Sequence, residues 1–106
     1  MENNGTRKYE GLWTMSMKEG QGVESFGNGD LYIGEYSHDK FHGKGELTTA
    51  GGKYTGHFKN GFKEGMGRMV FKNGCRYEGK FKLGRFDGKG LYIWTGIKSS
   101  IIPELV

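Results

Sequence analysis

The residues that could carry out chemistry in this chain of 106 residues are three histidines, one cysteine and a series of Gly-x-Gly pairs. His38, Asp39 and His42 have the residue types of a metal site, but two loop histidines four residues apart have no helix to align them. Cys75 has no sequence cue for an adjacent base and is predicted to be a turn residue that faces solvent. The Gly-x-Gly pairs lack the further motif residues of a phosphate-binding loop. The sequence therefore predicts no catalytic residue, no metal site and no cofactor.

Aromatic residues recur with a fixed period and are the stronger candidates for a binding site. Tyrosines open four similar blocks at spacings of 23, 22 and 23 residues. Each tyrosine is followed by a glycine two residues later, by a second aromatic residue four residues later, and by a Gly-x-Gly pair that starts 11 residues later. The tyrosines are Tyr9, Tyr32, Tyr54 and Tyr77, and the second aromatic residues are Trp13, Tyr36, Phe58 and Phe81. A period of this length indicates one supersecondary unit stacked four times.

The third block shows the elements that must position these rings. Tyr54, Gly56 and Phe58 alternate with Thr55 and His57, which predicts a strand with the three former residues on one face. After a loop, residues 65–71 alternate in the same way and predict a second strand. Asn-Gly at 73–74 then predicts a hairpin turn in which both residues tolerate positive φ. Four such blocks predict an all-β, single-layer antiparallel meander of four stacked hairpins, with about eight strands.

Glycines inside predicted strands need an explanation, because each one weakens a strand unless its missing side chain is used. Gly56 and Gly67 lie on facing strands and recur in every block. We expect them to leave room for rings from neighbouring repeats to lie across the backbone. A valine at either position is therefore expected to displace a ring.

Composition and charge limit the remaining possibilities. Hydrophobic residues make up 34% of the chain and aromatic residues 14%, which favours a thin sheet over a two-layer core. The single cysteine excludes an internal disulfide, and no secretory signal or membrane-spanning stretch is expected. We expect an N-terminal extension at 1–8, repeats at 9–31, 32–53, 54–76 and 77–98, and a tail at 99–106 that caps the last repeat or docks on another chain.

The net charge of +4 is unevenly distributed: residues 1–53 carry −2 and residues 54–98 carry +7. Lys80 and Lys82 are expected on the face opposite the aromatic rings. The positive region is extended by Lys59, Lys63, Arg68, Lys72, Arg76 and Arg85. This region is either a solvated surface or a contact for an acidic partner or anionic lipid. Nucleic acid is not expected, since binding of single strands requires rings and basic groups on the same face.

The four blocks resemble the MORN repeat (membrane occupation and recognition nexus), whose pattern is roughly Tyr-x-Gly-x-Trp-x-x-Gly-x-x-His-Gly-x-Gly. The blocks are YEGLWTMSMKEGQG, YIGEYSHDKFHGKG, YTGHFKNGFKEGMG and YEGKFKLGRFDGKG, and the match runs from Tyr9 to about Gly96. His42 stands at the histidine of the pattern, where the other blocks have Glu19, Glu64 and Asp87. The middle glycine is kept as Gly61 and Gly84 and replaced by Ser16 and Asp39.

The resemblance implies an elongated, solenoid-like sheet with an aromatic-lined groove that binds a peptide or helix of a partner. It also implies a non-catalytic scaffold or adaptor, as in ciliary and flagellar assemblies such as radial spokes and in other cytoskeletal scaffolds. The expected location is the cytoplasm, the cytoskeleton or the axoneme of a cilium or flagellum, within a multiprotein assembly or a homo-oligomer. The alternative is a peripheral membrane module that binds acidic phospholipids through the basic C-terminal half.

The predicted groove follows from the lack of a second layer, because part of the aromatic face should then stay open to a partner. Its lining comprises Tyr9, Trp13, Tyr32, Tyr36, Tyr54, Phe58, Tyr77 and Phe81, with Phe41, Phe62 and Phe86 at its edge. In the alternative, the rings only pack against one another from repeat to repeat.

Overall fold

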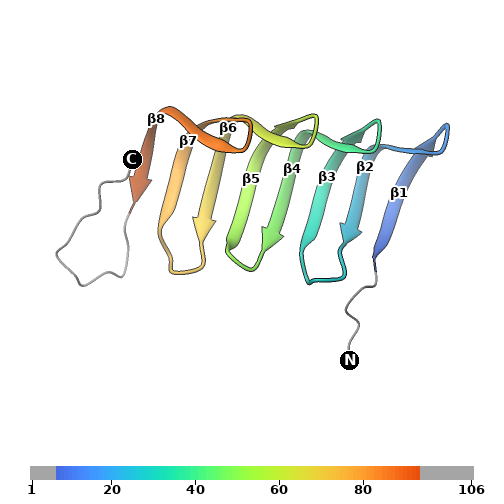
Figure 1. Cartoon of the computed structure of the whole chain (residues 1–106), viewed down its shortest axis with the longest axis horizontal. Coiled ribbons are helices and arrows are strands. Elements are labelled where there is room, and N and C mark those ends of the chain that lie inside the picture. Colours follow the sequence, from blue (N-terminus) through green and yellow to red (C-terminus); the bar gives the residue numbers. More distant parts are fainter. Residues whose placement is uncertain (1–6, 94–106) are drawn as a thin grey trace.

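Residues 7–93 form one sheet of eight antiparallel strands whose order in space is their order in the chain (Figure 1), as described by a computed structural model. The strands are β1 (Lys8–Thr14), β2 (Met17–Ser25), β3 (Leu31–Ser37), β4 (Lys40–Thr49), β5 (Gly52–Lys59), β6 (Phe62–Phe71), β7 (Arg76–Lys82) and β8 (Arg85–Ile93). The predicted all-β, single-layer meander is therefore confirmed. Within residues 7–93 there is no helix of the length and apolarity needed to cross a membrane. The predicted tail at 99–106 lies outside the described residues.

Two-residue turns join the two strands of each repeat. Both turn residues have positive φ in every case, for example Met15 and Ser16 at 53° and 67° and Leu83 and Gly84 at 51° and 84°. Such turns match the twist of the flanking strands, which explains why non-glycine residues are held in this region. The loop expected after Phe58 is thus a tight turn at Asn60-Gly61.

The turns at the other end of the strands differ from the prediction in their mechanism. Asn-Gly lies in a turn at 28–29 and again at 73–74, but only the glycines have positive φ, at 100° and 96°. The asparagine instead accepts a hydrogen bond through its side chain: the Asn73 Oδ1 atom receives the amide of Cys75 at 3.0 Å. The second repeat uses a shorter turn at Ala50-Gly51, as its missing residue predicts.

A β-bulge follows the glycine in the first strand of every repeat, for example between Gly56 and Phe58. The hydroxyl of Tyr54 donates a hydrogen bond to the carbonyl oxygen of the bulged residue, His57, at 2.8 Å. The other three repeat tyrosines make the equivalent bond at 2.8–3.1 Å. The bulge bends the strand, and the tyrosine hydroxyl satisfies the carbonyl group that the bulge leaves unpaired.

The paired glycines make room for the tyrosine of their own repeat. A Cβ atom on Gly56 would lie 2.5 Å from the Cα atom of Gly67 and 2.7 Å from the hydroxyl of Tyr54. The expectation that rings of neighbouring repeats lie over the glycines is therefore wrong. The reason is the short hydrogen bond to the bulge, which draws each ring across its own hairpin.

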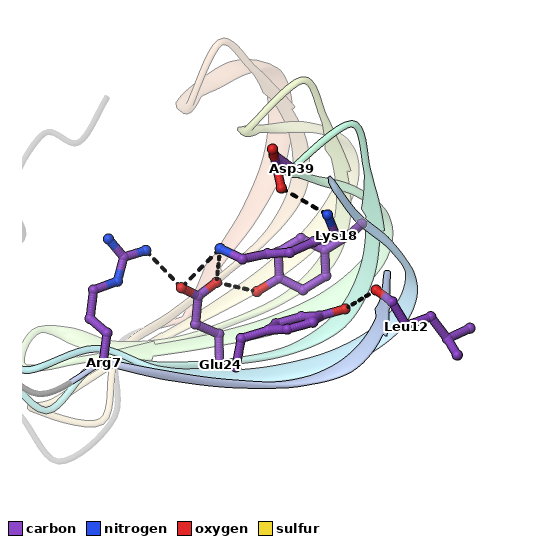
Figure 2. A network of polar contacts seen from close by, with 7 residues as sticks. Arg7, Leu12, Lys18, Glu24 and Asp39 are labelled. Atoms are coloured by element: carbon purple, nitrogen blue, oxygen red, sulfur yellow. Dashed lines mark hydrogen bonds and ion pairs between the residues drawn. The ribbon is translucent and has the colours of Figure 1, made fainter. Parts of the chain in front are cut away.

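The core is a column of rings along the sheet. Tyr54 contacts Phe58 of its own repeat and Phe81 of the next edge-on, with ring centroids 5.0 and 4.9 Å apart. The same alternation links the other repeats at 5.0–5.4 Å. Edge-to-face pairs at this spacing are favourable. The sheet curls around this column, so that a single layer encloses a core on its concave face (Figure 2).

Candidate functional site

Most of the rings predicted to line an open groove are buried. Six of them are only 0–5% exposed: Tyr32, Tyr36, Tyr54, Phe58, Tyr77 and Phe81. Their burial corrects the expectation that they are open to a partner, because each is covered by rings of its own and the adjoining repeat. Trp13 is 56% exposed, since no described strand precedes β1 to cover it, and Tyr9 is half-buried.

The open surface of the concave face is made by a different set of residues. We call them the covering residues; each follows its repeat tyrosine by nine positions, and they are Lys18, Phe41, Lys63 and Phe86. Phe41 stacks on Tyr32 with centroids 3.8 Å apart, and Phe86 stacks on Tyr77 at 4.1 Å. The covering residues therefore form the outer layer of the ring column.

Lysines take the covering position in the first and third repeats. The Nζ atoms of Lys18 and Lys63 lie 5.4 and 5.5 Å from the ring centroids of Tyr9 and Tyr54. Such cation–π contacts suit an ammonium group above a phenol ring. The sequence interpretation did not single out Lys18 and counted Lys63 only in the positive region, although counting nine residues from each tyrosine would have placed both beside Phe41 and Phe86.

Phe62 does not belong to this surface. It precedes the covering residue Lys63 by one position, so strand alternation directs it to the opposite face, where it is 49% exposed. Phe86, by contrast, is 46% exposed at the covering position. Of the three rings predicted at the groove edge, the structure therefore brings only Phe41 and Phe86 to the concave face.

A buried carboxylate organises the concave face of the first two repeats (Figure 2). Glu24 is 3% exposed and accepts hydrogen bonds from the hydroxyl of Tyr36 at 2.7 Å and from the guanidinium of Arg7 at 2.7 Å. The Nζ atom of Lys18 contacts both carboxylate oxygens, at 3.0 and 3.1 Å. The other repeats have Leu47, Met69 and Tyr92 in this position. Burial tends to raise the pKa of Glu24, but the bonds from Tyr36, Arg7 and Lys18 outweigh it and lower the pKa.

A pocket of about 250 Å³ opens beside this carboxylate. Its walls include the rings of Phe26 and Phe41, and its charged groups are the basic residues Arg7, Lys18 and Lys40 and the acidic residues Glu24 and Asp39. Arg7 also lies over the Phe26 ring at 5.0 Å. The pocket thus combines apolar walls with charged groups of both signs, a combination suited to an amphipathic protein segment.

The residues at the histidine position of the repeat pattern lie near the next repeat. The Glu19 carboxylate accepts the backbone amide of His38 in the next turn at 2.8 Å, and Glu64 accepts that of Leu83 at 3.3 Å. His42 occupies the equivalent place in the second repeat, and its Nδ1 atom is buried without a hydrogen-bond partner among the described residues. The Glu19 and Glu64 side chains therefore act in packing one repeat on the next.

The residues weighed as a metal or nucleophile site have other contacts. Asp39 accepts the backbone amide of Lys18 at 2.8 Å, and His38 contacts the Ser37 hydroxyl at 3.0 Å. No group of three metal-ligating side chains is placed together within residues 7–93. Cys75 is 1% exposed, so the expectation that it faces solvent is wrong; it directly follows the turn at 72–74, where its amide donates a hydrogen bond to the Asn73 side chain.

The basic residues proposed for anion contact lie mainly on the opposite, convex face. Lys80, Lys82 and Arg85 are exposed, and the two lysines alternate with the buried rings of β7 as expected. Arg76 is half-buried, and its Nε atom has no hydrogen-bond partner within the described part of the chain. Three of the four residues proposed for anion contact are therefore exposed.

A family model described as the MORN repeat matches residues 9–31, 32–53, 54–76 and 77–96. The matched segments together span most of the chain, and the prediction of four tandem repeats is confirmed. No curated protein matches the chain.

Proposed function

Because the chain belongs to the MORN repeat family, we propose that it is a non-catalytic scaffold that binds a protein partner on its concave face. Repeats of this family support a scaffold role, through protein contacts or association with membranes. The finer assignment to protein binding rests on the covering residues, which alternate along the sheet as Lys18, Phe41, Lys63 and Phe86 and so present apolar and basic groups in turn.

The rigidity of this surface supports the proposal. The phenyl rings of Phe41 and Phe86 are held flat against buried tyrosines, which are themselves fixed by hydrogen bonds to the bulges. A surface that is ordered before binding loses little conformational entropy when a partner docks. Aromatic residues on such surfaces commonly carry much of the binding energy.

The proposed setting is a multiprotein assembly of the cytoplasm, such as a ciliary or flagellar axoneme with a radial-spoke-like role, or another cytoskeletal structure. A homo-oligomer is compatible with the same role. This setting derives from the family alone, since fold does not fix cellular function.

The proposal is tested by capture of partners from cell extract at moderate salt with the tagged chain. Phe86→Lys is the informative variant, because the chain itself carries lysine at the covering position in two repeats. Met66→Lys is its control: Met66 is 59% exposed on the opposite face of β6. We expect Phe86→Lys to lose the partner and Met66→Lys to keep it; the reverse pattern would assign the interface to the convex face.

A second candidate is association with anionic membranes through the turn of the fourth repeat. Leu83 is 60% exposed and stands between the exposed residues Lys82 and Arg85. An apolar side chain flanked by basic groups suits the interface of an anionic bilayer. This candidate predicts binding to phosphatidylserine vesicles that falls steeply with salt and is lost in Leu83→Asp.

A further inference from the structure

Lys63 differs from Lys18 in having no carboxylate beside it. Both are covering residues, and both hold the Nζ atom above the tyrosine of their repeat. Lys18 is bound by Glu24, whereas Met69 stands at the equivalent position of the third repeat. Within residues 7–93, no carboxylate lies within ion-pair distance of Lys63.

The surroundings of Lys63 make this lack of a carboxylate significant. The side chain is partly buried, and this burial lowers the pKa of its ammonium group. Its neighbour Glu64 is directed to the opposite face and accepts the amide of Leu83. The ammonium is thus partly removed from water, and within residues 7–93 its contact is with the Tyr54 ring.

The first repeat supplies an internal example of the group that such a lysine binds. There, a carboxylate reaches Nζ with both oxygens at 3.0 and 3.1 Å while the ring contact is kept. In the third repeat, Met69 stands where the carboxylate would be, so an anion would have to reach Lys63 from outside the sheet, on its concave face.

We propose that Lys63 is the binding site for a side-chain carboxylate of the protein segment that docks on the concave face. The inference rests on the proposed function and adds the chemistry of the ligand. The covering residues on either side are Phe41 and Phe86, one repeat away in each direction. The bound segment therefore carries an acidic residue between two apolar residues.

The spacing of the covering residues indicates the conformation of this segment. Strands lie about 4.8 Å apart, so successive covering residues are separated by roughly 9.5 Å. A polyproline II segment advances about 3.1 Å per residue with three residues per turn, which places every third side chain on one side at about 9.3 Å. The preferred ligand is thus apolar-x-x-Glu-x-x-apolar, and aromatic-lined grooves are a known setting for such segments.

The test uses a blocked proline-rich peptide with Leu, Glu and Leu three residues apart, together with its Gln counterpart. Hydrogen bonds to charged groups support a preference of about tenfold or more for the Glu peptide. Lys63→Phe should abolish this preference, and it should preserve the fold, because Phe is the covering residue of two other repeats. Lys80→Phe changes the net charge equally on the opposite face and should keep the preference.

A second variant makes the result independent of Lys63 itself. Met69→Glu would supply the carboxylate from within the chain, as Glu24 does for Lys18, and should raise the Lys63 pKa and remove the preference for the Glu peptide. Equal binding of the two peptides, a preference that persists in Lys63→Phe, or no binding of either peptide would overturn the inference. Loss of phosphatidylserine vesicle binding in Lys63→Phe would also overturn it, by assigning the ammonium to a lipid. The proposed function would still stand if Phe86→Lys lost its captured partner.

Discussion

Substitution of Gly56 by alanine should destabilise the protein strongly, because the new Cβ atom would occupy space that the backbone and a buried ring already fill. It would lie 2.5 Å from the Cα atom of Gly67 and 2.7 Å from the Tyr54 hydroxyl. The ring of Tyr54, which is 1% exposed, has to move. An aromatic ring buries about 150–250 Å², equivalent to about 4–6 kcal/mol as an upper bound.

Partial relaxation of the sheet reduces this cost, and loss of the bond from Tyr54 to His57 adds about 1 kcal/mol. We therefore expect a loss of roughly 3–5 kcal/mol in the free energy of unfolding. For a domain of this size, 3 kcal/mol corresponds to a fall in Tm of about 12–24 °C. Thermal unfolding followed by circular dichroism measures this shift.

Gly51→Ala is the matched control for this substitution. A Cβ atom on Gly51 would approach only the Thr49 hydroxyl, at 3.9 Å, and the φ angle of Gly51 is one that alanine adopts without strain. Its Tm should therefore stay close to that of the unchanged protein. If Gly56→Ala and Gly51→Ala unfold at the same temperature, the claim that the paired glycines make room for the tyrosine rings is refuted.

Three further predictions concern the tyrosines and the buried carboxylate. Tyr54→Phe keeps the ring but leaves the His57 carbonyl unpaired, so urea titration should show a loss of about 1 kcal/mol in the free energy of unfolding. No loss would mean that the hydrogen bond does not stabilise the bulge. Burial raises the pKa of Tyr54 from 10.0 to about 12, so its stabilisation is complete below pH 10 and is lost as the pH rises towards 12. Phenolate absorbance from Tyr54, isolated as the difference from Tyr54→Phe, should therefore appear together with unfolding, and its appearance at pH 10 in the folded chain would contradict this. The pKa of Glu24 is lowered below its ordinary 4.5, so the stabilisation from its ionised form is present above pH 4.5 and is lost as the pH falls through the folded pKa. Glu24→Gln should therefore reduce the loss of protein stability on acidification. An unchanged loss would argue against the network.

The repeat architecture could be predicted from the sequence because each signal recurs four times. The alternation around Tyr54 and Phe58 and the glycine pairs fixed the strand pairs, their order and the face that carries the rings. The turn mechanisms could not be predicted, because tight turns at His38-Asp39 or Met15-Ser16 lack the glycine that usually marks positive φ. The local twist of the bent sheet imposes those angles, and no single residue type predicts them.

The candidate site was predicted on the correct face but from the wrong residues. The rings of Tyr32 and Phe58 were expected to stay open, yet the bulges curl the sheet until each ring is covered by its neighbours. The bulge depends on a hydrogen bond from a tyrosine to a carbonyl three residues later, which periodicity does not reveal. Lys18 was not singled out and Lys63 was counted only in the positive region, because a lysine by itself suggests a solvated surface, whereas the structure places both over tyrosine rings.

The central claim is that the concave face, and not the convex face, contacts the partner. A photo-crosslinking side chain at position 86 tests it most directly, with position 66 on the opposite face as the comparison. The account predicts that crosslinking in cells gives one or a few discrete protein adducts from position 86 and none of these from position 66. Protein adducts from position 66 alone, or only lipid adducts from position 86, would contradict it.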